Sequence, residues 1–435
     1  MHIDDFHDER RRSGNGGRGG IRTHGTVSRS LDFESSALSR TQPPFRWRTL
    51  DAGHGRGKLI LLIIGRTDAR RPLAPPVYCA AVIDREDLLG AFVADLEEAE
   101  WTALDTEADS LHAYPEKLCL IQITIPGQDV LVDPLAQLDL SGLFAALNRH
   151  TILMHGADYD VRLFKLGHDF VPNRIFDTML AARLTGRTSF GLSHLCQEIL
   201  GVELEKTSQK ANWAQRPLTE KMEEYARNDT RHLRLLVDAL RDELRDKGRT
   251  DWHTQECDRL VRDNSAPRKV NPDQVWRIKG SAKLEPRALA VLRELWNWRE
   301  KEAQRRNRPP FFILTPDVMI KMSESLQTGK DANDFIPRRM PEHRRRELQR
   351  CIKAGRAVPE NDCPTKHRPP PRKHISPAQK KRFEEIQSRR NRAAERLEID
   401  PTIIASRATM VRLACEADGV FEDVLPWQRA LLGVD

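Results

Sequence analysis

Three short apolar segments follow one another closely in this chain, and they constrain its architecture more than any other feature. They lie at Thr102–Thr106, Leu118–Thr124 and Asp129–Asp133, with polar residues between them. Short runs of apolar and β-branched residues bounded by turn residues predict strands. Three consecutive strands followed by helices predict a mixed sheet that opens on a meander, so this part of the chain is expected to be α/β.

Helical periodicity accompanies these strands. The segment Val82–Glu100 carries an apolar stripe on one helical face, with Asp84 as its candidate N-cap. Two more short strands are expected at Thr151–Met154 and Ile175–Asp177, and a long helix at Thr219–Leu244. The remaining helices of this region are expected at Leu138–Asn148, Tyr159–Leu166, 178–184 and Leu192–Leu200.

Beyond residue 251 only helical patterns remain. They are expected at Pro286–Gln304, Thr315–Met322, Asp331–Phe335, Pro341–Ala354, Ser376–Leu397, Pro401–Leu413 and Pro426–Leu432. A stretch rich in Pro, Lys and Arg at 358–375 is typical of a linker. The predicted organisation is therefore an α/β domain at 77–250 followed by two small all-α domains, at 284–357 and 376–435.

Residues 1–76 differ from the rest of the chain. The Arg/Gly run Arg10–Gly20 and the Ser-rich segment Ser28–Thr41 show no periodicity. This composition predicts a disordered leader or an extension outside the folded protein. The alternative is an RNA-binding arm built on four arginines. These are Arg10, Arg11, Arg12 and Arg18.

Composition excludes several classes of protein. The 435 residues are 31% charged and 39% hydrophobic, which excludes a fully disordered chain. The longest apolar run, Leu59–Ile64, is far shorter than the roughly 20 residues that cross a bilayer, so no membrane association is expected. Seven scattered cysteines without a C-x-x-C pair fit a reducing cytoplasm. The net charge of +7 is compatible with a nucleic-acid partner but is not specific for one.

The candidate functional residues are acidic and lie at the ends of the expected elements. Asp105 and Glu107 end the first strand two residues apart, so the period of 2 puts both carboxylates on one face. Asp160 begins a helix directly after a buried strand. Tyr225 and Asp229, four residues apart, share one face of a helix. Each pattern alone is typical of a solvated turn or a surface pair, but their order and spacing together favour a site.

Four converging carboxylates suit a pair of divalent cations. Mg²⁺ and Mn²⁺ are hard ions that prefer oxygen ligands, and they neutralise acids that would otherwise repel one another. Two such ions can activate a water and stabilise the leaving oxygen of a phosphodiester. Tyr225, one helical turn from Asp229, is placed to hydrogen-bond the attacking water.

Three separated motifs carry a resemblance to a known family. The first is Leu104–Glu107 with the strand segment Lys117–Ile123, and the second is His155–Asp160. The third runs from Asn212–Leu218 to Glu224–Asp229. In this order they resemble the three exonuclease motifs of the ribonuclease D family, which belongs to the DEDD exonucleases.

The resemblance covers 78–249 and implies a ribonuclease H-like fold with a mixed five-stranded sheet flanked by helices. It implies four catalytic carboxylates that bind two Mg²⁺ or Mn²⁺ ions. These are Asp105, Glu107, Asp160 and Asp229. Tyr225 is then catalytic too and marks the tyrosine subtype, because the histidine subtype would have His at position 224, where this chain has Glu.

Four polar residues near these motifs are candidate substrate contacts, with ordinary surface polarity as the alternative. These are His112, Gln122, Lys165 and Arg216. Gln122 is expected to point from the neighbouring strand, where an amide can meet a base or a sugar.

The helical part also resembles this family. The segment Glu285–Gly355, with its Arg308–Phe311 motif, resembles the helicase-and-RNase-D C-terminal (HRDC) domain, a small nucleic-acid-binding module. Asp400–Leu432 resembles a degenerate second copy. Seven arginines of the first module could bind RNA phosphates, unless they only solvate charged helices. These are Arg305, Arg306, Arg338, Arg339, Arg344, Arg345 and Arg346.

The function expected from this resemblance is a metal-dependent 3′–5′ exoribonuclease that releases 5′-monophosphates. Its expected partner is RNA, namely tRNA precursors or other structured RNA with 3′ extensions, with no obligate protein partner. The alternatives are a 3′–5′ DNA exonuclease of the same superfamily and a non-catalytic RNA-binding scaffold that retains the fold.

Overall fold

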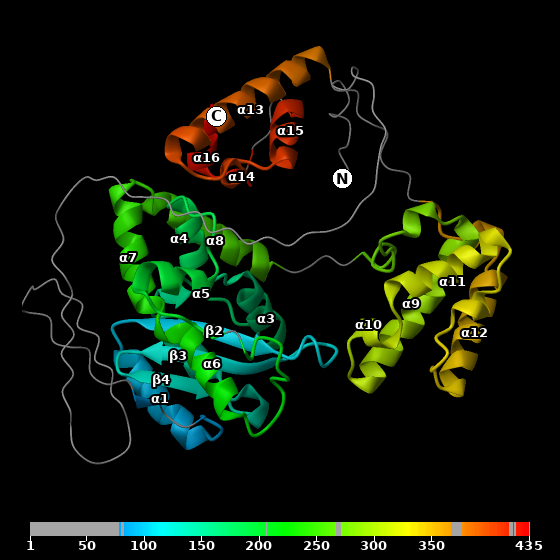
Figure 1. Cartoon of the computed structure of the whole chain (residues 1–435), viewed down its shortest axis with the longest axis horizontal. Helices are drawn as coiled ribbons and strands as arrows, with labels where there is room; N and C mark the ends of the chain where they lie inside the picture. Colours follow the sequence, from blue (N-terminus) through cyan, green and yellow to red (C-terminus); the bar gives the residue numbers. More distant parts are fainter. Residues whose placement is uncertain are drawn as a thin grey trace, which may run out of the picture. The chain divides into compact units, whose positions relative to one another are not determined.

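The computed structural model describes residues 78–79, 82–205, 207–266, 271–366, 376–416, 421 and 423–434 (Figure 1). The predicted leader at 1–76 and the second half of the predicted linker, 367–375, lie outside the described residues. Within the described ranges, no helix combines the length and the apolar character that crossing a membrane would need. The six cysteines whose side chains are described are all free.

The described strands form one mixed sheet in the order β1-β4-β3-β2-β5-β6. They are β1 (Tyr78–Cys79), β2 (Thr102–Ala108), β3 (Leu118–Ile125), β4 (Gln128–Val132), β5 (Ile152–Met154) and β6 (Ile175–Asp177). Strands β2, β3 and β4 form an antiparallel meander, while β5 and β6 continue the sheet parallel to β2. The predicted mixed α/β sheet opening on a meander is therefore confirmed, with the two-residue β1 as an edge strand that the sequence pattern did not predict.

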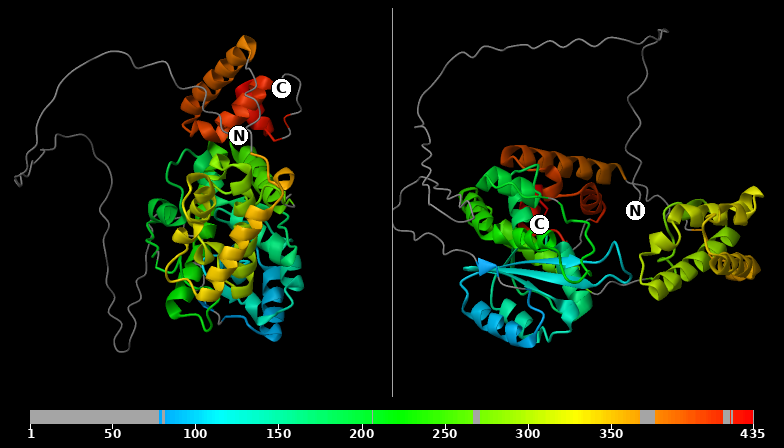
Figure 2. Two further views of the ribbon diagram at one scale, coloured as in Figure 1. Left: turned by 90° about the vertical axis from the view of Figure 1, so that its right-hand side faces the viewer. Right: turned by 60° about the horizontal axis from the view of Figure 1, so that its bottom comes forward.

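Helices cover both faces of this sheet, because β2 is apolar on both faces where it starts. Leu104 packs into the core beneath α1 and α3, whereas Ala103 packs into the core beneath α4 and α7. Figure 2 shows α1 and α7 on opposite sides of the strands. The helices around the sheet are α1 (Glu86–Glu98), α2 (Ser141–Leu147), α3 (Asp158–His168), α4 (Thr178–Leu184), α5 (Leu192–Leu195), α6 (Glu220–Arg231), α7 (Leu233–Asp246) and α8 (Thr250–Ser265).

The prediction of one long helix at Thr219–Leu244 is wrong, because the chain bends at His232 and forms α6 and α7. The two halves face different cores. Met222 of α6 packs with side chains of β3 and β4, whereas Leu236 of α7 packs in the core shared with α4. A straight helix could not bury the apolar faces of both halves. The bend at His232 turns the apolar face of α7 toward its own core.

Two helical modules follow. The first comprises α9 (Pro286–Arg306), α10 (Pro310–Ile313), α11 (Pro316–Thr328) and α12 (Glu342–Ala357), around a core of its own. The second comprises α13 (Pro377–Leu397), α14 (Pro401–Ile404), α15 (Arg407–Cys415) and α16 (Pro426–Leu432). The predicted helix Pro401–Leu413 is thus two helices, because the Ser406 side chain caps α15 by accepting from the Thr409 amide.

The two modules repeat each other locally. A long helix ends at a left-handed residue, Asn307 in α9 and Glu398 in α13. A one-turn helix that begins with proline follows, and then a helix capped by Thr315 or Ser406. This parallel supports the interpretation of the second module as a degenerate copy of the first.

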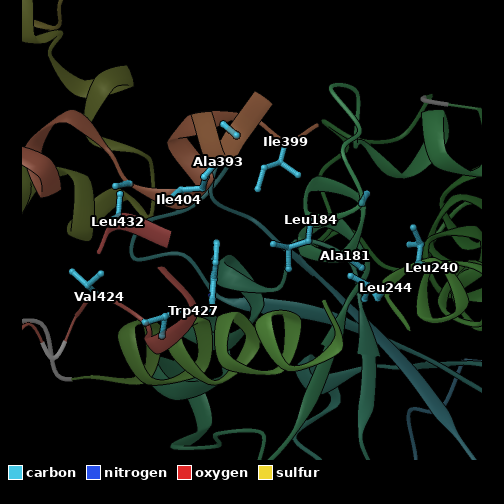
Figure 3. Close-up of a cluster of buried hydrophobic side chains, with 14 of the residues drawn as sticks. Ala181, Leu184, Leu240, Leu244, Ala393, Ile399, Ile404, Val424, Trp427 and Leu432 are labelled. Atoms are coloured by element: carbon cyan, nitrogen blue, oxygen red, sulfur yellow. The ribbon is translucent and has the colours of Figure 1, made fainter. Parts of the chain in front are cut away.

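The second module shares a core with the sheet domain (Figure 3). Leu184 and Leu244 of the sheet domain belong to the same buried cluster as Ile404 and Trp427 of the second module. Trp427 also stacks on Trp252 of α8, with ring centroids 4.6 Å apart and an interplanar angle of 12°.

Backbone contacts reinforce this junction. Arg249 donates to the carbonyl oxygens of Leu184, at 2.5 Å, and Leu397, at 2.6 Å, on the two sides of the junction. Gly186 has φ +104°, and a Cβ at this position would lie 2.5 Å from the Glu398 carbonyl oxygen. Both the conformation and the close approach therefore require glycine. The second module completes the core of the sheet domain.

We predict that Trp427→Ala destabilises the sheet domain as well as the second module, because their core is continuous. Removing a large buried aromatic side chain costs about 3–5 kcal/mol. Urea unfolding followed by the far-UV signal of the whole chain measures this loss. Leu235→Ala on the exposed face of α7 is the control and should change stability by less than about 0.5 kcal/mol. A second module that unfolds alone in the Trp427 variant, with an unchanged transition of the sheet domain, would contradict the shared core.

A buried histidine makes this packing sensitive to pH. His253 of α8 is 3% exposed, lies 4.2 Å from the Phe176 ring between centroids, and donates from Nε2 to the Asp177 carbonyl oxygen at 3.0 Å. Burial lowers the pKa of His253 from 6.5 to about 4. The imidazole is therefore neutral in the folded protein but takes up a proton on unfolding whenever the pH is below about 6.5.

We predict that His253 contributes to a loss of stability on acidification. The unfolded state binds more protons than the folded state between pH 6.5 and 4, so the free energy of unfolding falls as pH falls through this window. Between pH 7 and pH 5, this group alone should lower the free energy of unfolding by about 2 kcal/mol. Urea titrations at both pH values should show a smaller difference for His253→Gln than for the parent. His194→Gln, at a half-exposed position, is the control and should keep the parental difference.

Candidate active site

The site begins at the end of β2. Asp105 and Glu107 lie on the same face of this strand as Ala103, and they pair across the sheet with Gln122 and Leu120 of β3. The register shifts between Glu107 and the next residue, so a bulge ends the regular ladder directly after the second carboxylate. Bulges next to strand ends re-aim side chains, which suits a site at this edge.

A third carboxylate arrives from α3. Strand β5 runs parallel to β2, so the helix that follows β5 starts at the same edge of the sheet. Asp160 lies in its first turn, is 6% exposed, and accepts a hydrogen bond from the Thr106 hydroxyl. The nearby Asp158 instead points outward, half exposed, and pairs with Arg162 at 3.4 Å. The structure thus separates the two acids: Asp160 faces the site and Asp158 the solvent.

The start of α3 is held from β6. Asp177 is fully buried and accepts from the Ala157 amide at 2.8 Å and from the Leu180 amide at 2.9 Å. Gly156, with φ +68°, makes the turn that leads into α3. Asp177 therefore caps α4 and fixes the direction of α3 at the same time.

The fourth carboxylate and the tyrosine come from α6. The Thr230 hydroxyl lies 2.8 Å from the Thr124 hydroxyl of β3. Arg231 donates from Nε to the buried Asp129 of β4 at 2.5 Å. Because α6 is bound to both strands next to residue 229, the register of Asp229 over the sheet is fixed. Tyr225, one turn earlier, packs against the buried Trp213 ring, with centroids 6.0 Å apart.

The electrostatics shows that these acids share one site. Burial, followed by repulsion from Asp229 and Asp160, raises the pKa of Glu107 to about 9. Burial and the charge of Asp160 raise the pKa of Asp229 to about 7. Burial also raises the pKa of Asp160 to about 6. The pKa of Asp105 is raised well above its usual value by burial and then by Asp160, Asp229 and Glu107.

Tyr225 belongs to the same group. Its pKa is raised by burial first, and then by the charges of Asp229, Glu107 and Asp105. The phenol therefore faces the carboxylates and keeps its proton. Side chains from β2, α3 and α6 meet at one sheet edge as the sequence motifs suggested.

The donor chemistry of this group fits divalent cations. Four carboxylates that disfavour one another's charge need added positive charge, and their oxygens are the ligands that Mg²⁺ and Mn²⁺ prefer. Next to Asp105, the Gln122 amide is fully buried, and neither its nitrogen nor its oxygen has a hydrogen-bond partner. As the side chains are placed in the described part of the chain, no group of three or more acids, histidines or cysteines could hold a metal ion, so the four carboxylates are candidate ligands by their chemistry.

The four predicted substrate contacts lie in different surroundings. His112 is exposed, with Nε2 3.4 Å from the Lys210 carbonyl oxygen, and Lys165 pairs with Asp169 at 2.5 Å on the outer face of α3. Gln122 lies beneath α6 rather than on the surface. Arg216 donates to Asp133 at 2.5 and 2.6 Å and to three carbonyl oxygens. Its guanidinium thus ties the segment before α6 to the sheet.

Four residues that support the site were not found by sequence reasoning. These are Thr106, Thr124, Asp129 and Asp177. Thr106 stands between two acids of the first motif, and Asp177 occupies the N-cap position of a helix, which is a usable sequence signal. Asp129 and Thr124 carry no local signal, because Arg231 and Thr230 are about a hundred residues away in the chain.

Family models and curated proteins that are similar to this chain indicate which proteins share these motifs. Residues 80–245 match a family model described as 3′–5′ exonuclease, and residues 288–332 match the HRDC domain. The ribonuclease D of Gluconacetobacter diazotrophicus is 28% identical over 356 residues, 80% of this chain and 89% of that protein. The ribonuclease D of Pseudomonas paraeruginosa is 34% identical over 235 residues, 53% of this chain and 61% of that protein.

Solved structures agree in fold. The crystal structure of Escherichia coli RNase D, described as an exoribonuclease involved in structured RNA processing, has a TM-score of 0.64 and 25% identity, covering 81% of this chain and 96% of that one. A protein from Bifidobacterium adolescentis has a TM-score of 0.70 at 22% identity, covering 82% and 95%. The similarity therefore extends across the sheet domain and the helical modules.

We predict that Asp129→Asn loosens α6 selectively. The variant keeps the size of the side chain but removes the charge that Arg231 contacts, and a weakened buried pair costs about 1–3 kcal/mol. Hydrogen exchange of the amides at 220–231 should accelerate, while the amides of α1 should keep their protection. Asp238→Asn, in the half-exposed pair with Arg234, is the control and should leave both regions unchanged. Equal acceleration in α1 and α6 would show a global rather than a local effect.

Proposed function

We propose that the chain is a 3′–5′ exoribonuclease of the ribonuclease D family that trims the 3′ extensions of structured RNA precursors, tRNA precursors among them. Each cycle hydrolyses the last phosphodiester of the strand, releases a nucleoside 5′-monophosphate and leaves a new 3′-hydroxyl. The observation that carries this proposal is the group of four acids from three elements whose pKa values are raised by burial and, for three of the four, also by the charges of acids in the same group.

In this proposal, Asp105, Glu107, Asp160 and Asp229 hold two divalent cations, Mg²⁺ or Mn²⁺. When bound, the cations supply an activated water and stabilise the charge that develops on the leaving oxygen. The chain itself supplies the positions of the four ligands. Thr106 orients the Asp160 carboxylate, and α6 fixes the distance of Asp229 from the strand that carries the first two acids.

Tyr225 has a separate role in the proposed reaction. It lies one turn from Asp229, and its hydroxyl keeps its proton in these surroundings. A protonated phenol can hold the attacking water, or a phosphate oxygen, by a hydrogen bond and so restrict its direction of attack. The rate contribution of Tyr225 is therefore orientation rather than proton abstraction.

The proposed RNA substrate rests on the similarity to a solved relative. The Escherichia coli relative is described as acting in structured RNA processing, and we extend this class of substrate to the present chain. The cytoplasm, expected from the cysteine pattern, is then the proposed place of action. No protein partner is required by the proposed reaction, since all five catalytic side chains come from one chain.

We predict that Asp229→Asn abolishes hydrolysis of a 3′-extended tRNA precursor while RNA binding survives. The substitution removes one ligand charge but keeps the shape of α6, and the surfaces that bind RNA lie outside the carboxylate group. Gel analysis of labelled RNA measures cleavage, and fluorescence anisotropy measures binding. Asp238→Asn, on the neighbouring α7, is the control and should cleave at the parental rate. Full activity of the Asp229 variant would refute the assignment of this carboxylate.

Two companion measurements separate the roles within the site. Tyr225→Phe should lower kcat about a hundredfold with little change in RNA affinity, because only the hydrogen bond of the hydroxyl is lost.

Removal of divalent cations with a chelator should stop hydrolysis by the parent, and Mg²⁺ or Mn²⁺ should restore it. Hydrolysis that continues in the presence of the chelator would refute the assignment of the four carboxylates as ligands of catalytic cations, whatever the result for Tyr225→Phe.

A further inference from the structure

The first helical module exposes two adjacent aromatic rings on its shortest helix. Phe311 is 46% exposed and Phe312 61% exposed, and their ring centroids are 4.5 Å apart. The next residue of α10, Ile313, is buried. Single exposed apolar residues are ordinary on a protein surface, but two contiguous large rings are not. The other strongly exposed large apolar residues of the described chain stand singly along the sequence. These are Leu88, Leu111, Leu166, Leu235 and Val275.

The second module shows what the corresponding turn does when it has a partner. Thr402 and Ile403 of α14 occupy the positions that Phe311 and Phe312 occupy in α10. Ile403 is partly buried against the core shared with the sheet domain. With Thr402 it lines a cavity whose other walls include Leu180 of α4 and Arg259 of α8. The turn is therefore a contact surface in one copy. In the other copy it carries larger, aromatic side chains and faces solvent.

The charge around the two rings is basic. Arg308 is exposed two residues before α10, and Arg305 and Arg306 lie in the last turn of α9 with side chains that are 60% and 40% exposed. One buried carboxylate, Glu302, contacts both of these α9 arginines, so the patch keeps a net positive charge. Aromatic faces beside arginines fit a single-stranded nucleic acid, whose bases stack and whose phosphates pair with cations. An apolar protein partner would not need this charge.

The patch is connected to the strand that carries the first two acids. Asn307, which ends α9, accepts from the Tyr114 amide at 3.2 Å, and Glu300 accepts from the Tyr114 hydroxyl. Tyr114 lies in the loop that leaves β2 after Glu107 and returns as β3. The beginning of α10 thus lies next to the loop that continues from the catalytic strand, on the chain segment that follows Asn307 directly.

We infer that Phe311 and Phe312 form a stacking platform, with Arg308 beside it, for the single-stranded segment of RNA that leads to the 3′ end being cut. This inference rests on the proposed action on RNA 3′ extensions and adds a binding surface outside the carboxylate group. The platform takes bases without regard to their identity, because every base presents an aromatic face. It acts on the affinity for tailed RNA and leaves the chemical step unchanged.

The test is binding of a fluorescent RNA with a long single-stranded 3′ tail to Asp229→Asn protein, with and without Phe311→Thr and Phe312→Ile. These two substitutions copy the turn of the second module and keep Ile313 in place. We expect affinity about ten- to a hundredfold weaker, since stacking of each base contributes substantially to such complexes. Phe312→Tyr should restore most of the affinity, because the aromatic face returns. Leu166→Ala, at an exposed position of α3, should leave affinity unchanged.

Turnover with the active protein distinguishes this inference from the proposed function. The double Phe variant should hydrolyse a dinucleotide at the parental rate and raise KM, but not kcat, for the tailed RNA. A parent that fails to cleave any RNA refutes the proposed function while the binding experiment still reports on the platform. Unchanged affinity for tailed RNA overturns the platform. Unchanged affinity together with loss of self-association in sedimentation would assign the rings to a contact with a second copy of the chain.

Discussion

A group of four acids, of which Asp160 is buried and the other three are partly buried, is the constraint on which the rest of the structure depends. Burial raises the pKa of all four carboxylates, and repulsion within the group raises the pKa values of Asp105, Glu107 and Asp229 further, so the elements that carry these acids need supports that keep them in place. The elements that carry the acids are held by buried side chains that hydrogen-bond to residues distant in the sequence. Asp129 and Thr124 hold α6, while Asp177 holds α3, and the meander holds β2. The sheet and its helices thus hold the four carboxylates close together, and added positive charge would stabilise this arrangement.

Much of the architecture could be predicted from local patterns. The strands of the meander and the helix α16 were predicted close to their observed bounds, because each is a short apolar segment bounded by polar or turn residues. The long helix predicted at Thr219–Leu244 failed for a nonlocal reason: its two apolar stripes face two different cores, and only the packing of β3 and α4 reveals that. The boundary between α14 and α15 was missed for a local reason, because the capping residue Ser406 divides what periodicity alone would join.

The site shows the same division. The acidic residues of the site could be predicted from the sequence, since their spacing along the strand and the helix places them on a shared face. The burial of the polar residues beside them could not be predicted. Gln122 and Arg216 are polar residues beside the motifs, and composition gives no sign that one lies beneath α6 and that the other uses its guanidinium to fasten a loop to Asp133. Hydrogen bonds between residues about a hundred positions apart depend on the complete fold, so the supports of the site become visible only there.

The two helical modules show how one local design can serve two roles. Both place a one-turn helix after a left-handed residue, and in both the two middle side chains of this turn are exposed or only partly buried. In α14 these are Thr402 and Ile403, and the turn packs against the sheet domain, where Gly186 leaves room for the Glu398 backbone. In α10 they are two phenylalanines that no described residue covers in the same way. The same turn thus lies at a contact within the chain in one module and carries two exposed aromatic rings in the other, where we propose that it contacts the substrate.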